Sequence, residues 1–127
     1  MTFDIPKEKW TEFLNDLSRR RFGWETRIEV ISENMGDQIL SSGLPLTGVT
    51  FQDRAGRMEI EILVGEGTSH QAHSISDPSA LSYLSEPDHY RGLLEIEEAN
   101  GTKTLLSLID PMPVQMGYAA FKIVAAS

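Results

Sequence analysis

The hydrophobic pattern of this chain changes its period at Gly23, and this change constrains the fold more than any other feature. Before Gly23, apolar residues recur with the spacing of one helix face, at Trp10, Phe13, Leu14 and Leu17. After Gly23, apolar and polar residues alternate over residues 24–30, as in a strand with one buried face. The pattern therefore predicts one N-terminal helix followed by a sheet, with Trp10 as a buried anchor of the helix.

The ends of the predicted helix carry recognisable signals. Asp4 is expected to accept hydrogen bonds from the free N–H groups at the helix start, and Pro6 suits the first turn. Three arginines, residues 19–21, fall in the last turn, and Gly23 follows as a left-handed cap. These arginines allow two interpretations, an anion or nucleic-acid patch and compensation of the helix dipole. We favour the second, because the rest of the chain is acidic.

Residues 58–64 give the clearest strand, with Met58, Ile60, Ile62 and Val64 on one face and glutamates on the other. Glycine and proline at Gly43, Pro45 and Gly48 are expected to break the chain before a short strand at 49–52. Further strands are predicted at 69–76, 81–84, 93–98 and 102–109.

The last two of these strands form a hairpin whose register the sequence constrains. A two-residue loop at Asn100-Gly101 would mix apolar and polar residues on both faces. A three-residue loop, residues 99–101, with Gly101 in the left-handed conformation, places Glu97 opposite Lys103. It also gathers one apolar face that consists of Leu94, Ile96, Leu106 and Leu108. We predict the three-residue loop, because a slip by one residue would invert these faces.

These elements indicate an α+β fold, in which the N-terminal helix packs on a mostly antiparallel meander sheet. The sheet is expected to be curled or to form a small open barrel. We predict a single domain over residues 1–127, with the helix at 1–23, the sheet at 24–110 and a tail of unassigned structure at 111–127.

Composition excludes several classes of site. The 127 residues contain no cysteine, which excludes disulfides, zinc–thiolate sites and cysteine nucleophiles. The net charge of −8 predicts that the chain binds neither nucleic acid nor an anionic membrane surface. The N-terminus lacks the pattern of a secretory signal, and no apolar stretch reaches the length of a membrane helix. We therefore expect a cytoplasmic location.

The segment from Ser69 to Leu84 carries the strongest functional signal. It contains His70, His73 and Asp77, and His89 follows shortly after. In a regular strand, His70 and His73 point to opposite faces and cannot hold one ion together, whereas a bulge would allow it. We therefore predict no metal and no other cofactor here, and interpret Asp77 before Pro78 as a turn residue.

Three other motifs have structural explanations. Gly65-Glu66-Gly67 resembles a phosphate loop, but it lacks a lysine and joins two predicted strands, so we interpret it as a hairpin turn. The glutamates of the predicted strands alternate with apolar residues, which is typical of a solvent-facing side rather than of an acid–base pair. No serine lies in a G-x-S-x-G turn of the hydrolase type.

Several segments resemble a family of short, acidic bacterial proteins of unknown function. They include Phe3-Asp4-Ile5-Pro6 with Trp10, the run from Gly43 to Val49, and the run from His73 to Pro78. The stretch from Leu94 to Thr102 resembles the family as well. The resemblance implies a free-standing bacterial domain and transfers no catalytic residue.

Three functional hypotheses follow. The first is a non-catalytic binding or accessory domain that takes a protein or a small molecule. The second is a small metal-dependent or hydrolytic enzyme built on His70, His73, Asp77 and His89. The third is a structural self-association domain that forms a homo-oligomer through the tail or an edge strand. We rank them in this order.

Overall fold

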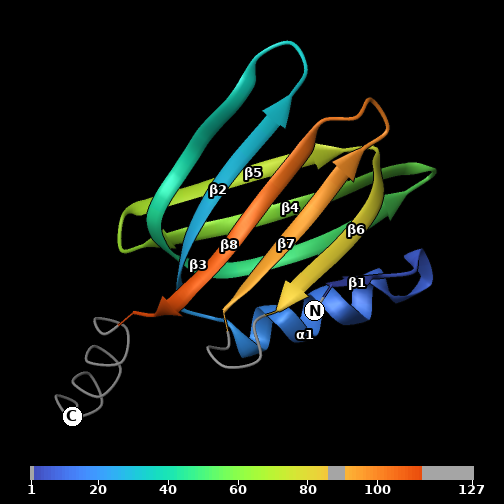
Figure 1. The fold of residues 1–127 in the computed structure, drawn as a ribbon. Helices are drawn as coiled ribbons and strands as arrows, with labels where there is room; N and C mark the ends of the chain where they lie inside the picture. Colours follow the sequence, from blue (N-terminus) through green and yellow to red (C-terminus); the bar gives the residue numbers. More distant parts are fainter. Residues whose placement is uncertain (1, 86–90, 113–127) are drawn as a thin grey trace, which may run out of the picture.

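Eight strands form one antiparallel sheet in the computed structural model, which describes residues 2–85 and 91–112. The strand order across the sheet is β1-β6-β7-β8-β2-β3-β4-β5 (Figure 1). The strands are β1 (Thr2–Asp4), β2 (Trp24–Ser32), β3 (Gly36–Arg54), β4 (Arg57–Glu66), β5 (Ser69–Ser76), β6 (Pro78–Ser85), β7 (Gly92–Glu98) and β8 (Lys103–Pro111). The helical elements are the short 3-10 helix η1 (Lys7–Lys9) and the helix α1 (Trp10–Arg20).

The long strand β3 joins two layers of the curled sheet. Its first half pairs with β2 and its second half with β4, so it belongs to both layers. The layer that contains β6, β7, β8 and β2 crosses over the layer of β4 and β5 in Figure 1. The expected chain break at Gly43, Pro45 and Gly48 was therefore wrong. These residues lie at or beside register shifts within one strand, and such bulges bend a strand without ending it.

The topology corrects the expected simple meander. Strands β2 to β5 follow one another across the sheet, as do β6 to β8, but β8 returns to pair with β2. The sheet is not closed, which agrees with the expected curled or open arrangement. With one short helix beside eight strands among the described residues, the fold is also richer in sheet than an even α+β division.

The N-terminal segment departs from the predicted helix at 1–23. Thr2–Asp4 is strand β1, which pairs with β6 and places Phe3 opposite Tyr83. The Asp4 carboxylate accepts a hydrogen bond from Ser82 Oγ at 2.8 Å, and no side chain caps η1. The expected cap at Asp4 was therefore wrong, because the sheet ladder holds this residue away from the helix start.

The core lies between the two layers of the sheet, with α1 along one end (Figure 1). Trp10, Leu14 and Leu17 are the buried residues of α1, as the helical spacing predicted. Trp10 is 2% exposed, donates its indole N–H to the Ile5 carbonyl at 2.8 Å, and meets Phe51 edge to face. These contacts confirm Trp10 as a core anchor.

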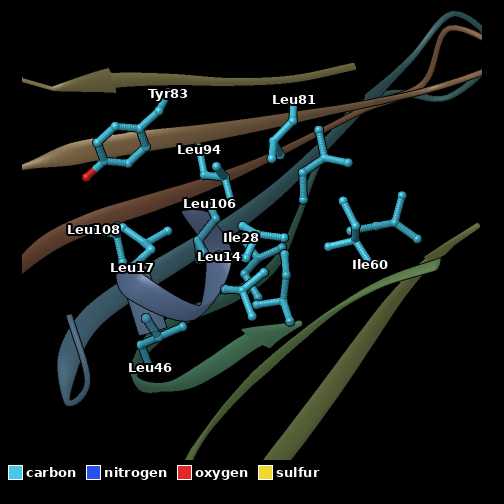
Figure 2. Packing of buried hydrophobic residues seen from close by; sticks show 14 of the residues in the cluster. Leu14, Leu17, Ile28, Leu46, Ile60, Leu81, Tyr83, Leu94, Leu106 and Leu108 are labelled. Carbon is cyan, nitrogen blue, oxygen red and sulfur yellow. The ribbon is translucent and has the colours of Figure 1, made fainter. Parts of the chain in front are cut away.

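Figure 2 shows Leu81, Leu94 and Leu106 from one layer and Ile60 from the other, directed into the same space. All four are buried. The alternating pattern of residues 58–64 is confirmed, because Ile60, Ile62 and Val64 belong to this core.

The hairpin of β7 and β8 has the predicted three-residue loop. Leu94 pairs with Leu106 and Glu97 with Lys103, and Gly101 has a φ of 94°. All four leucine and isoleucine residues of the predicted apolar face are buried. The Lys103 ammonium lies 3.6 Å from Glu95, which is the diagonal neighbour of Lys103 on the same face. At the end of β8, Pro111 pairs with Trp24, and the predicted tail from residue 113 onward lies outside the described residues.

Candidate functional site

The histidine segment is an outer strand of the sheet. Residues Ser69–Ser76 form β5, which confirms the predicted strand, and β4 is its neighbour among the described strands. All eight residues of β5 pair with β4 in one continuous register, from Ser76 opposite Glu59 to Ser69 opposite Glu66. The predicted hairpin is confirmed, but its turn is at Gly67-Thr68, because Gly65 and Glu66 still pair with β5 as the last residues of β4.

The position of His70 has a structural explanation. It pairs with Gly65 on β4, and the imidazole lies over the glycine Cα, where a Cβ would meet His70 and the Ser69 carbonyl. Gly65 is buried and has a φ of 150°. His70 thus covers a glycine on a neighbouring strand, which is a recognised way to shield exposed backbone.

His73 lies on the opposite face of β5, as strand parity predicted. It is half-buried beside the core residue Ile75, and its Nε2 lies 3.1 Å from the Gln71 side-chain oxygen. Burial lowers the pKa of His73 below its ordinary value of 6.5. The imidazole is therefore neutral at pH 7 and available as a polar group on the strand's core-facing side.

Asp77 forms the corner between β5 and β6, as predicted for an aspartate before proline. Its φ is 50°, its N–H donates to the Met58 carbonyl at 3.0 Å, and its carbonyl accepts from the Ala99 N–H at 3.0 Å. Through these two bonds, Asp77 connects β4 in one layer with the β7–β8 loop of the other layer. Asp77 also lines a polar hollow of about 610 Å³ together with Arg54 and Arg57.

The structure does not bring the candidate metal or catalytic residues together. His70 and His73 face opposite sides of β5, and Asp77 follows its far end, roughly 23 Å along the strand from His70. His89 lies outside the described residues. Among the residues that the structure describes, no group of three or more histidine, aspartate or glutamate side chains could hold a metal ion.

A further hollow in the described structure is a groove that the sequence did not predict. It has a volume of about 980 Å³ and lies between β1 and the outer side of η1 and α1. Its apolar lining comes from Phe3, Ile5, Pro6 and Phe13. Phe3 is 46% exposed, which is unusual for a phenylalanine and marks the apolar part of the groove. We call this hollow the α1–β1 groove.

The polar lining of the α1–β1 groove carries an excess of negative charge. Its charged residues are Asp4, Glu8, Lys9, Glu12, Asp16 and Arg19. Both cations are engaged by carboxylates of the same groove, Lys9 with Glu12 at 3.8 Å and Arg19 with Asp16 at 2.9 Å. Because the carboxylates outnumber the cations, the groove favours a positively charged ligand.

The three arginines at the helix end have partners within the protein. Arg19 and Arg20 both pair with Asp16, each at 2.9 Å. The Arg21 guanidinium lies 4.6 Å from the centre of the Trp24 ring, in a cation–π contact. The arginines therefore belong to the helix terminus, as the dipole interpretation expects.

Comparison with known proteins places the chain in a family. Residues 1–116 match the family of unknown function DUF5335. The chain belongs to this family. The DUF5335 chain is also similar to an uncharacterised protein of Aquifex aeolicus (strain VF5), with 27% identity over 110 residues, which cover 87% of this chain and 94% of that protein. No solved structure matches it significantly.

The resemblance stated from the sequence is thus confirmed, and it provides no activity. Sequence reasoning on the DUF5335 chain missed the α1–β1 groove, because the groove combines residues 3–6 with the solvent side of α1. The pairing of β1 with β6, far along the chain, creates that arrangement. The one local signal was Phe3, an aromatic residue outside the helical pattern.

Proposed function

We propose that this DUF5335 protein is a non-catalytic binding domain and that its α1–β1 groove holds an extended, basic segment of another polypeptide. The observation that carries the proposal is the groove itself, an acidic and partly apolar hollow beside an edge of β1 that no described strand covers. Its volume of about 980 Å³ is at the upper end of the range of typical ligand sites.

The shape of the groove supports an extended ligand. Its lining runs from Glu8 to Arg19, which corresponds to roughly 17 Å along a helix axis. Five residues of an extended peptide cover about the same length. A groove between a strand edge and a helix suits strand addition, in which backbone hydrogen bonds give affinity and alternate side chains give specificity.

The backbone of β1 provides groups for such a ligand. The Ile5 N–H donates to the Leu81 carbonyl of β6 at 2.8 Å. Because bonding direction alternates along an antiparallel strand, Phe3 shares the orientation of Ile5 toward β6. The backbone groups of Thr2 and Asp4 then point to the open side, where a peptide strand would pair.

The charge of the groove supports a basic ligand and opposes nucleic acid. We propose no binding to nucleic acids or anionic membranes, because the chain's net charge is −8 and Arg19 and Arg20 already pair with Asp16. Among the described residues, no helix is long and apolar enough to cross a membrane. The expected bacterial origin and cytoplasmic location remain parts of this proposal.

Selection of a random peptide library on the full chain tests the proposal. We expect enriched peptides in which apolar residues alternate with lysine or arginine. Their binding should weaken at least about tenfold in Glu8→Lys, which reverses a groove charge, and should weaken with added salt. Phe3→Ala should also weaken it.

The matched control is Phe22→Ala, because Phe22 is 60% exposed and does not line the groove. This variant should bind the selected peptides normally. Failure to enrich any peptide, or peptides that bind equally to wild type and Glu8→Lys, would contradict the proposal.

A further inference from the structure

Strand β5 leaves a row of backbone groups without a neighbouring strand in the described part of the structure. The Asp77 N–H, one residue beyond the strand, donates to the Met58 carbonyl on β4. Because antiparallel bonding alternates, the odd-numbered residues of β5 also bond to β4. The backbone N–H and C=O groups of His70, Ala72, Ser74 and Ser76 therefore point to the open side.

This edge lacks the features that normally prevent strand pairing between molecules. Proteins protect edge strands with charges, prolines, bulges or short length. β5 has eight residues, none of them charged or proline, and its register with β4 is unbroken. The first half of β3 is also an edge, but it carries Asp37, Pro45 and two register shifts. Of these two edges, only β5 is regular and neutral enough to pair.

A second copy of the same strand fits this edge. Two β5 strands that run antiparallel about a two-fold axis at Ala72 pair His70 with Ser74 of the partner copy through outward backbone groups. Ala72 then faces its own copy on the axis, where a small side chain is needed because two identical groups meet. On the core-facing side, His73 falls opposite Gln71 of the other copy. These two side chains already hydrogen-bond within one strand, at 3.1 Å, so they are chemically complementary.

The surroundings of Ala72 leave room for a second strand. A hollow of about 280 Å³ opens beside His70, Gln71 and Ala72, and Leu63 and Val64 contribute its apolar surface. Side chains of the partner copy can pack into this hollow on either side of the axis.

The charge distribution permits the approach despite the net charge of −8. Glu59 and Glu61 lie on β4, one strand behind β5, and Asp77 follows the end of β5, away from the axis at Ala72. Across the pair, β4 and its copy are three strand spacings apart, roughly 14 Å. This distance exceeds the screening length of about 8 Å at physiological salt, so repulsion across the seam is weak there.

We propose that two copies of this chain associate through β5, in antiparallel register about Ala72, so that one sheet continues across the dimer. This interface is separate from the α1–β1 groove, and it does not depend on the function proposed for that groove.

Sedimentation velocity and equilibrium on the full chain test the proposal. We expect a mass of twice 14.2 kDa at high protein concentration and a stronger dimer at higher salt. Ala72→Lys, which sets two ammonium groups against each other, and Ser74→Pro, which removes one outward N–H, should both give monomers. Proline is tolerated where an edge N–H faces outward, so both variants should unfold at the wild-type temperature.

The matched control is Ala80→Lys, which introduces the same charge at an exposed position of β6. It should leave the dimer intact. Hydrogen exchange adds a specific signature: the amides of residues 70, 72 and 74 should gain protection with protein concentration in wild type and not in Ala72→Lys. A wild-type chain that remains monomeric up to about 1 mM overturns the proposal. A dimer that survives both β5 variants overturns it as well.

Discussion

At one end of the sheet, β1 contributes three residues that are followed shortly by Pro6, whereas at the other end β5 contributes eight residues without charge or proline. Two hydrogen bonds fix β1. The Ser82 hydroxyl donates to the Asp4 carboxylate, and the Trp10 indole donates to the carbonyl of Ile5, which directly follows the strand. β5 is held by its ladder with β4 and by Ile75 in the core. The comparison teaches that β1 depends on side-chain contacts and on the nearby helix for its position, whereas β5 depends on its ladder with β4.

The first test of this comparison removes the anchor on the β1 side. Trp10→Ala should lower the free energy of unfolding by about 3–5 kcal/mol, because a buried indole and its hydrogen bond to Ile5 are lost. Urea denaturation followed by circular dichroism measures the change. The control Phe22→Ala, at an exposed aromatic residue, should change it by less than about 0.5 kcal/mol. An unchanged midpoint in Trp10→Ala would show that the β1 side does not depend on this anchor.

The second test crowds the β5 side. Gly65→Ala should cost about 1–3 kcal/mol, because a Cβ at a φ of 150° would collide with the Ser69 carbonyl and with His70. Adding His70→Ala should recover part of this loss, which a double-mutant cycle measures. If the two changes were simply additive, the imidazole would not be the obstacle that the structure indicates.

The third test uses pH to probe the same strand. Because burial lowers the pKa of His73, the unfolded chain takes up a proton near pH 6.5 that the folded chain resists. Stability should therefore decline as the pH falls below about 6.5, until the folded-state pKa is passed. Unfolding titrations between about pH 7.5 and about 5 should show a smaller decline in His73→Gln. Gln71→Ala is the control and should retain the decline, because burial rather than the hydrogen bond causes the shift.

The smallest expected change in stability concerns Glu98. This residue pairs with Pro78, beside the corner that connects β5 with β6. Burial, and secondarily the charge of Asp77, raise the pKa of Glu98 above its ordinary value. The folded chain therefore loses stability as the pH rises through that interval, and the full loss is present at neutral pH. Glu98→Gln should increase the free energy of unfolding at pH 7 by up to about 0.5 kcal/mol. Equal stability of Glu98→Gln and the control Glu97→Gln would contradict this cause.

Local pattern predicted the elements whose partners are close in the sequence. The β7–β8 register followed from Glu97, Lys103 and the apolar residues around Gly101, since one slip would expose the core face. The parity argument also separated His70 from His73 correctly. The β7–β8 register and the opposite faces of His70 and His73 depend only on alternation and turn chemistry, which act over a few residues.

The features that failed depend on distant partners. Gly43 and Pro45 signal a break, yet β2 and β4 hold both halves of β3 in one strand. Thr2–Asp4 is too short to show a period, and it is a strand only because β6 pairs with it. The α1–β1 groove and the edge position of β5 follow from the strand order, which periodicity does not contain.

The pairing of Thr2 with Leu84 also has a consequence for how the chain is made. A ribosome adds about 5–20 residues per second, so roughly 4–16 s pass between the synthesis of β1 and that of its partner. The edge of β2 that pairs with β8 waits for a similar time, because Trp24 pairs with Pro111 and Ile31 with Lys103. The nascent chain therefore exposes two unpaired strand edges that the finished sheet covers, and such non-local pairings place folding on the slower, millisecond-to-second scale.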